Sequence, residues 1–212
     1  MRFLPILLIL LLTSCKHKDK SRVLPFIGNY DIEYSIKNGV EVADTVYPKM
    51  IPFEFLNQDS LKVTNESFKG KVWVADFFFT TCPTICPAMT KNLKWLNEQT
   101  IDLKNDIQFI SFTINPNHDT PTSLMNYKKH YKISSSNWSF LTGDEAFTHQ
   151  LGIDHFQIFA GQDASAAGGY AHSGAFTLID KEGYVRGVYL GTDMKHVKQL
   201  EKDLRKLLKY EY

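Results

Sequence analysis

The sequence predicts one α/β domain with a central mixed sheet flanked by helices. Two apolar runs, residues 72–79 and 107–114, are typical of strands that are buried on both faces of a sheet. Each run is followed by a helical segment, and a β-hairpin pattern and one more helix come last in the chain. A length of 212 residues suits one well-packed domain with additions better than two domains.

The part of the domain before the first buried run predicts short strands. Residues 26–48 alternate weakly between apolar and polar side chains, which indicates an N-terminal β extension. Residues 53–56 and 61–64 flank a polar turn and predict a hairpin. Asn65 or Ser67 then suits the cap of one helical turn that ends near residue 70.

Proline and capping residues predict where the next two helices begin. Pro87 suits the first position of a helix over residues 87–99. Because a residue before proline is pushed out of the α region, we expect Cys86 at the N-cap of that helix. After the second buried strand, Asp119 or Thr120 is expected to cap a helix that runs from Pro121 to about residue 131.

The remaining elements complete the order of a thioredoxin-like fold. They are a strand at 138–141, a helix at 144–151, a flexible loop of small residues at 160–169, a hairpin at 174–190 and a helix at 193–209. In that architecture the loop that enters the terminal hairpin lies against the helix after the first buried strand. The residue of this chain in that loop is His172.

Two cysteines at the junction between the first buried strand and its helix are the candidate reactive groups. They belong to the stretch Cys82-Pro83-Thr84-Ile85-Cys86-Pro87. The free N–H groups and partial positive charge of a helix N-terminus favour a thiolate over a thiol. Cys82 and Cys86 are therefore expected to act as nucleophiles or as metal ligands.

With His172 the two thiols form a set that suits copper. Soft thiolates select Cu(I), and imidazole suits copper in either oxidation state. Zinc is the competing metal, because two cysteines and one histidine with an open fourth position also occur in catalytic zinc sites. The alternative without metal is a dithiol/disulfide pair, and a disulfide at this spacing would be readily reduced.

Two other residues are weaker candidates. Asp76 interrupts the first buried run, and in similar thioredoxin-class proteins a buried carboxylate there takes up a proton during disulfide exchange; a core aspartate satisfied by hydrogen bonds is an equally good interpretation. Met89 could be an extra soft ligand, but methionine at helical spacing is usually core. The other histidines of the domain are interpreted as surface or structural residues; they are His118, His130, His149, His155 and His196.

The N-terminus has the pattern of a bacterial lipoprotein signal. The apolar run at residues 3–12 is too short to span a bilayer, and it leads into the tetrapeptide Leu12-Thr13-Ser14-Cys15, which resembles a lipobox. We therefore expect a signal peptide at 1–14, a lipid on Cys15, a tether at 15–25 and the domain at 26–212. The protein is then held by its lipid on the periplasmic side of a bacterial membrane.

Charge excludes one large class of partner. The chain has 24 basic and 23 acidic residues and a formal net charge of +1, so it lacks the excess of positive charge that is typical of nucleic-acid-binding proteins. The basic residues of the last helix lie opposite an apolar stripe and are those of a solvated helix face.

Three stretches together resemble the Sco/SenC family of copper-binding thioredoxin-like proteins. They are the strand with the Cys82 to Cys86 motif, residues 115–121, and His172-Ser173 leading into residues 176–183. The resemblance implies copper held by Cys82, Cys86 and His172, and a role in assembling the dinuclear copper centre of a haem–copper oxidase. One departure is Asn115, where the family commonly has aspartate, and it affects partner contacts more than the ligand set.

Three functions are compatible with these residues. The first is a membrane-anchored copper chaperone that passes copper to the copper-accepting subunit of the oxidase. The second is a thiol–disulfide oxidoreductase that uses Cys82 and Cys86 to reduce the target cysteines before they accept copper. The third, a peroxide-reducing or redox-sensing protein, rests on Cys82 and its neighbours alone. His172 separates the first two, because copper binding needs it and thiol exchange does not.

Overall fold

A seven-stranded mixed sheet forms the centre of the protein in the computed structural model, which describes residues 23–212. Its two middle strands are β5 (Val72–Phe78) and β6 (Ile107–Thr113), which run parallel to each other and are buried at every residue. β7 (Trp138–Thr142) continues the sheet in parallel beyond β6, and β10 (Ala175–Ile179) pairs antiparallel with β5. The outer strands are β11 (Val185–Leu190), β3 (Glu54–Asn57) and β4 (Lys62–Thr64), in the order β11-β10-β5-β6-β7-β3-β4.

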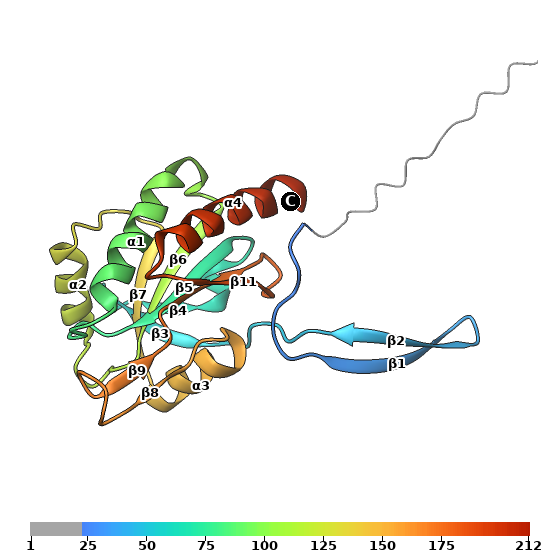
Figure 1. Cartoon of the computed structure of the whole chain (residues 1–212), viewed down its shortest axis with the longest axis horizontal. Coiled ribbons are helices and arrows are strands. Elements are labelled where there is room, and N and C mark those ends of the chain that lie inside the picture. The colour runs from blue at the N-terminus through green and yellow to red at the C-terminus, as the bar shows by residue number, and fades with distance from the viewer. Residues whose placement is uncertain (1–22) are drawn as a thin grey trace, which may run out of the picture.

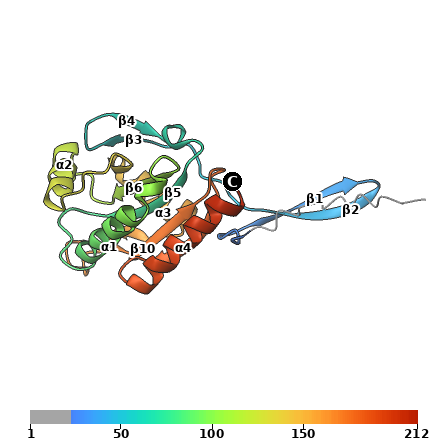
Figure 2. The same cartoon turned by 90° about the horizontal axis from the view of Figure 1, so that it is seen from above.

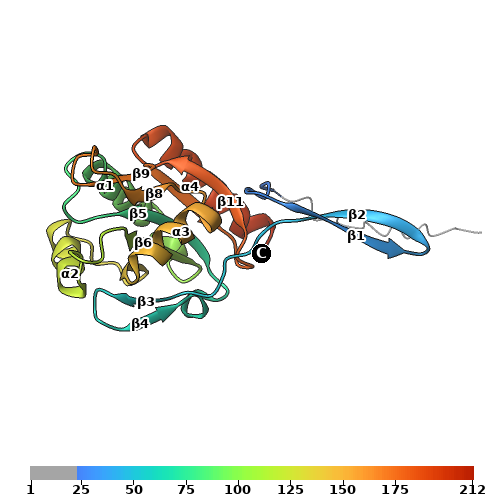
Figure 3. The same cartoon turned by 90° about the horizontal axis from the view of Figure 1, so that it is seen from below.

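Helices cover both faces of this sheet. α1 (Cys86–Gln99) and α4 (Met194–Tyr210) lie side by side on one face, and α3 (Glu145–His155) lies on the other (Figures 1 and 3). α2 (Pro121–His130) packs against β7. It is joined to α1 by a hydrogen bond of 2.6 Å between the hydroxyl groups of Tyr127 and Thr90. The predicted α/β fold with a mixed sheet between helices is therefore confirmed.

Side-chain patterns explain these helices. The apolar stripe of α4 is fully buried; its members are Val197, Leu200, Leu204 and Leu207. Asp193, Thr120 and Asp144 cap α4, α2 and α3 by accepting hydrogen bonds from backbone N–H groups of the first turn. The last helix thus starts where the sequence predicted, while α3 extends past the predicted end at residue 151.

The prediction for the start of α1 was wrong by one residue. Cys86 is the first helical residue and Ile85 is the N-cap, with backbone angles already in the helical region. The N–H groups of Ala88 and Met89 both donate to the Ile85 carbonyl, so the missing N–H of Pro87 removes no helical hydrogen bond. A residue before proline is only disfavoured in the helical region, and Cys86 adopts that conformation here all the same.

Part of the predicted flexible loop is a second small sheet. β8 (Ala160–Gln162) and β9 (Tyr170–His172) pair antiparallel, with Ala160 opposite His172. The turn between them is ordered by Asp163, which accepts from the N–H and hydroxyl of Ser165, and by the N–H of Gly169 donating to Ala166. Small residues here allow a tight turn, which composition alone does not distinguish from a mobile loop.

The predicted helical turn at residue 65 is the 3-10 helix η1 (Asn65–Phe68), and a second one, η2 (Ile101–Leu103), follows α1. Thr64 is the N-cap of η1 in place of the predicted Asn65 or Ser67. Ser67 instead accepts a hydrogen bond from the Thr64 N–H at 3.1 Å.

The N-terminal extension is a hairpin that projects from the domain. β1 (Asp31–Lys37) and β2 (Val40–Val46) pair antiparallel over their whole length and stand away from the sheet and helices (Figures 1 and 2). The expected signal peptide and Cys15 lie outside the described residues. From residue 23 onward the structure contains no helix that is long and apolar enough to cross a bilayer.

Candidate metal centre

The structure brings Cys82, Cys86 and His172 together at one end of the central sheet. Their ligand atoms all lie within 4.8 Å of one another, and Cys86 Sγ is 3.1 Å from His172 Nε2. Cys82 lies in the loop after β5, Cys86 begins α1, and His172 is the last residue of β9. In residues 23–212 no other three histidine, cysteine or acidic side chains form such a group.

A buried carboxylate fixes the start of the cysteine loop. Asp119 is fully buried and accepts hydrogen bonds from the backbone N–H of Thr80 at 2.9 Å, from the Thr80 hydroxyl, and from the Thr113 hydroxyl at 2.6 Å. Cys82 then donates its N–H to the Phe79 carbonyl at 3.2 Å, which turns the chain toward α1. The only sequence signal at Asp119 was that of a candidate helix cap, so this role was not predicted.

A second polar network fixes the strand that carries His172. The hydroxyl of Tyr170 lies 3.2 Å from both Asn115 Oδ1 and Glu145 Oε1. Glu145 also accepts from Gln162 at 2.6 Å and from Asn117 at 2.9 Å. We call these residues the Glu145 clamp, because they join β8, β9, the start of α3 and the loop after β6.

Aromatic packing completes the support of His172. The ring of Phe79 lies 5.5 Å from that of Tyr170 and 6.1 Å from that of His172. Gly168, with φ of +90°, passes so close to Phe79 that a Cβ atom there would lie 2.9 Å from the ring. The turn of the small sheet is thus pressed onto the residue that precedes the cysteine loop.

The two thiols have very different acidities. A hydrogen bond from Cys86, supplemented by one from His172, holds the pKa of Cys82 far below its usual range. Donation to Cys82, together with burial, raises the pKa of Cys86. The two thiols therefore lose one proton readily and keep the second, which they share in the hydrogen bond between Cys86 and Cys82. A soft cation can take the place of this shared proton.

Exposure separates the thiols further. Cys82 is 8% exposed, whereas Cys86 is 1% exposed and fully enclosed by the core. An attacking or accepting group from solution therefore reaches Cys82 first. The Nδ1 atom of His172 is buried and has no hydrogen-bond partner among the described residues. Nε2 is the nitrogen that faces the sulfur atoms.

Asp76 lies on β5 and is not one of the three clustered groups. It accepts a hydrogen bond from Ser111 at 2.5 Å, and burial raises its pKa to about 7, an effect that the nearby His172 partly offsets. β5 lies inside the sheet, so this carboxylate is in the interior and not at an edge. The hydrogen bond from Ser111 fits the interpretation of a satisfied core aspartate, and the raised pKa fits that of a group that takes up a proton near neutral pH.

The weaker candidates are not brought into the cluster. Met89 is fully buried as part of the core. His118 bonds to Asp119, His149 contacts the Ile114 carbonyl through Nε2, and His196 accepts from the Leu190 N–H. Each of these three histidines therefore has a structural partner.

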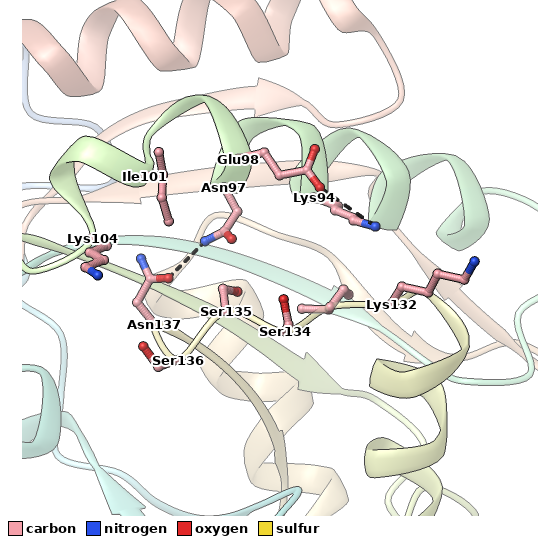
Figure 4. A pocket seen from close by; sticks show the side chains of 11 residues that line it. Lys94, Asn97, Glu98, Ile101, Lys104, Lys132, Ser134, Ser135, Ser136 and Asn137 are labelled. Atoms are coloured by element: carbon pink, nitrogen blue, oxygen red, sulfur yellow. Dashed lines mark hydrogen bonds and ion pairs between the residues drawn. The ribbon is translucent and has the colours of Figure 1, made fainter.

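A separate hollow lies between α1 and the chain that connects α2 to β7 (Figure 4). Lysine, serine and asparagine side chains line it, and Asn97 donates to Asn137 across its floor at 3.1 Å. None of its lining residues is a cysteine or a histidine. It therefore offers no soft ligand and is distinct from the cysteine cluster.

The fold and the cluster together define a class of protein: a thioredoxin-like domain whose two cysteines at a helix start face a histidine at the end of a short neighbouring strand. The model of the SCO1/SenC family matches residues 43–209. The chain belongs to the SCO1/SenC family.

Individual relatives agree with this assignment. The SCO1 protein homolog of Bacillus subtilis is 34% identical over 160 residues, which cover 73% of this chain and 80% of that protein. The crystal structure of a SCO1/SenC family lipoprotein from Bacillus anthracis has a TM-score of 0.70 and 34% identity, covering 76% of this chain and 95% of that one. BsSco, described as a member of the Sco family of cytochrome c oxidase assembly proteins and as having a disulfide switch, has a TM-score of 0.67 and 32% identity over 74% of this chain and 92% of its own.

Proposed function

We propose that this protein binds Cu(I) through Cys82, Cys86 and His172 and delivers it during assembly of the dinuclear copper centre of a haem–copper oxidase. The observation that carries the proposal is the convergence of two sulfur atoms and one imidazole nitrogen within 4.8 Å. Membership of a family in which a 32% identical relative is described as an oxidase assembly protein supports the same role.

The ligand set favours copper over zinc. Two thiolates and one imidazole form a soft set that suits Cu(I), which is stable with three ligands. Zinc takes four ligands: structural zinc sites are almost always closed by a fourth protein ligand, and catalytic zinc sites hold a water or substrate in the fourth position. The cluster contains no fourth histidine, cysteine or acidic side chain from the described residues.

The arrangement also supports a route by which copper passes to an acceptor. Cys82 is the more exposed thiol and lies on a loop, so a cysteine of the acceptor can approach the metal from that side. Copper then moves by exchange of one thiolate ligand for another, with Cys82 released first. We propose the copper-accepting subunit of the oxidase as this acceptor.

We also propose that the mature chain is anchored through a lipid on Cys15 on the periplasmic side of the membrane. Residues 1–14 act as the signal and 15–25 as the tether of a domain spanning 26–212. The sequence Leu12-Thr13-Ser14-Cys15 supports this, as does a 34% identical relative that is described as a lipoprotein. Mass spectrometry of membrane-extracted protein should find a diacylglycerol on Cys15, and an unmodified thiol there would reject the anchor.

A thiol–disulfide oxidoreductase that reduces the target cysteines is the second candidate function. The acidic Cys82 thiol and the buried Asp76, with a pKa raised to about 7, favour it. Exchange needs both cysteines but not His172. The two functions can coexist in one molecule, and the histidine distinguishes them experimentally.

The test is a Cu(I) titration of the reduced protein followed by X-ray absorption of the complex. We expect one Cu(I) per chain with two sulfur neighbours and one nitrogen neighbour. The variant His172→Ala should lose the nitrogen neighbour and bind more weakly, whereas His196→Ala, which changes a histidine of α4, should match the wild type. A zinc-selective protein, or a nitrogen neighbour that survives in His172→Ala, would refute the assignment.

A further inference from the structure

One face of the projecting hairpin is apolar and open to solvent. Residues directly opposite each other in an antiparallel pair share a face, and Ile32, Tyr34 and Ile36 oppose Thr45, Ala43 and Glu41. The three large side chains are 53%, 68% and 78% exposed. We call the surface formed by Ile32, Tyr34, Ile36, Ala43 and Thr45 the apolar hairpin face; Glu41 lies at its tip.

The opposite face of the hairpin carries the charges. Asp31, Glu33 and Asp44 lie on it together with Ser35 and three smaller apolar residues, Val40, Val42 and Val46, and the single cation Lys37 is paired with Asp44 at 2.7 Å. The hairpin is therefore amphipathic, with one nearly uncharged face and one charged face. Two strands alone are marginally stable in water, and an exposed apolar surface of this kind marks a binding surface.

Only the last four residues of β2 fall within the match to the family. The match to the family begins at residue 43, so β1 and the turn of the hairpin lie before it. The hairpin is also remote from the cysteines and His172. Its apolar face needs an explanation of its own.

Both legs of the hairpin are fixed to one end of the domain. On the first leg, the Ile27 N–H donates to the Val185 carbonyl at 2.9 Å; on the second, the Met50 N–H donates to the Gly183 carbonyl at 2.8 Å. The ring of Phe26 packs 5.2 Å from that of Tyr47, which links the two legs. The base of the hairpin is thus held against the turn between β10 and β11.

The described chain also begins at this end. The Val23 N–H donates to Glu211 at 2.8 Å, and the buried Arg186 donates to the Leu24 carbonyl at 2.5 Å while pairing with Glu211. Cys15 precedes Val23 by a stretch that reaches at most about 28 Å when fully extended. Each hairpin strand has seven residues and is about 24 Å long. A lipid on Cys15 and the hairpin are therefore within reach of the same membrane surface.

We propose that the apolar hairpin face lies on the lipid surface of the membrane that holds the anchor. This inference rests on the proposed lipid at Cys15. A tyrosine between two isoleucines suits the boundary between headgroups and acyl chains, and the charged face is then turned to water. Because the contact face is nearly uncharged, its binding does not require anionic lipid.

The contact would orient the metal centre. The turn that holds the hairpin follows Ile179, which pairs with Trp73 at the start of β5, whereas Cys82 follows the end of β5. The hairpin base and the cysteines are thus at opposite ends of the central strand. Docking of the hairpin directs the end of the domain that carries the ligands away from the point of attachment, where a membrane-bound acceptor can reach it.

Photo-crosslinking of the full-length chain in vesicles tests the proposal. The protein is reconstituted at low density in phosphatidylcholine vesicles that contain a photoactivatable phospholipid, and lipid adducts are mapped by mass spectrometry. We expect adducts on the apolar hairpin face. The double variant Ile32→Asn/Ile36→Asn should lower the adduct yield at least fivefold, whereas Val40→Asn/Val42→Asn, which removes apolar groups from the opposite face, should keep most of it.

The same samples separate this proposal from the anchor. No hairpin adduct in a chain whose Cys15 carries lipid would overturn the docking and leave the anchor standing. Hairpin adducts on a chain with unmodified Cys15 would overturn the anchor and support the docking. Crosslinks from hairpin to hairpin in place of lipid adducts would show that a second copy covers this face, and would overturn the proposal.

Discussion

The buried carboxylate of Asp76 makes the stability of the apo protein depend on pH in a defined direction. Its pKa is raised from 3.8 to about 7 by burial, so the folded state holds this proton more tightly than the unfolded chain. The stability contributed by the protonated group is fully present below about pH 4 and is lost as the pH rises to about 7. A shift of this size corresponds to about 4 kcal/mol, since one pKa unit is worth about 1.4 kcal/mol.

Replacing Asp76 by Asn removes this titration and keeps an oxygen that can accept from Ser111. The variant should therefore gain stability relative to the wild type between pH 4 and pH 7, by a total of about 4 kcal/mol, and the difference should stay constant above pH 7. Urea unfolding of the reduced protein at pH 4.5, 6, 7 and 8 measures it.

The control is Asp102→Asn, which changes an exposed carboxylate. Arg205 holds the pKa of Asp102 below its usual range, so its contribution is lost as the pH falls, with the opposite sign. A stability difference between Asp76→Asn and the wild type that does not vary with pH would refute the raised pKa and remove the support it gives to proton transfer at this site.

Three further substitutions test other parts of the structure. Tyr170→Phe removes only the hydroxyl that joins β9 to the Glu145 clamp. It should weaken Cu(I) binding about fivefold in a competition titration, which corresponds to about 1 kcal/mol. An unchanged affinity would show that the clamp does not position His172. Arg186→Ala breaks a buried ion pair with Asp180 and Glu211 and should lower the free energy of unfolding by about 3–5 kcal/mol, against less than about 1 kcal/mol for the half-exposed Arg205→Ala. Gly168→Ala should be destabilising by about 1–3 kcal/mol in the same urea experiment, because the residue has φ of +90° and no room beside Phe79; a neutral result would show that the turn is free to move.

Local patterns were enough to predict the sheet, its helices and the three clustered groups. β5 and β6 are mostly apolar runs broken only by a few polar residues, a pattern typical of strands buried on both faces. Cys82 and Cys86 are close in sequence at a strand-to-helix junction. His172 could be matched to them because the order of elements already fixed which loop faces the first helix.

The supports of the site could not be predicted in the same way. Glu145 meets Tyr170 and Asn115 only after α3, β9 and the loop after β6 have been brought together, and no spacing in the sequence encodes that contact. Asp119 carried a signal for a helix cap, and its bonds to Thr80 and Thr113 depend on the register of β5 against β6.

Composition was also ambiguous in the segment before His172. Glycine, alanine and serine are as compatible with the tight turn between β8 and β9 as with a mobile loop. The pairing of Ala160 with His172 decides between them, and it depends on a strand partner that is itself only three residues long.

Copper-dependent stabilisation tests the central claim most directly. A ligand that binds only the folded state at about a thousandfold over its dissociation constant adds about 4 kcal/mol of stability, which raises the melting temperature of a domain of this size by on the order of 10 °C. We predict this rise when Cu(I) is added to the reduced wild type, and loss of most of it in His172→Ala, although Cys82 and Cys86 in that variant still form and break a disulfide. A full copper-induced rise in His172→Ala would contradict the ligand assignment, and no rise in the wild type would contradict copper binding itself.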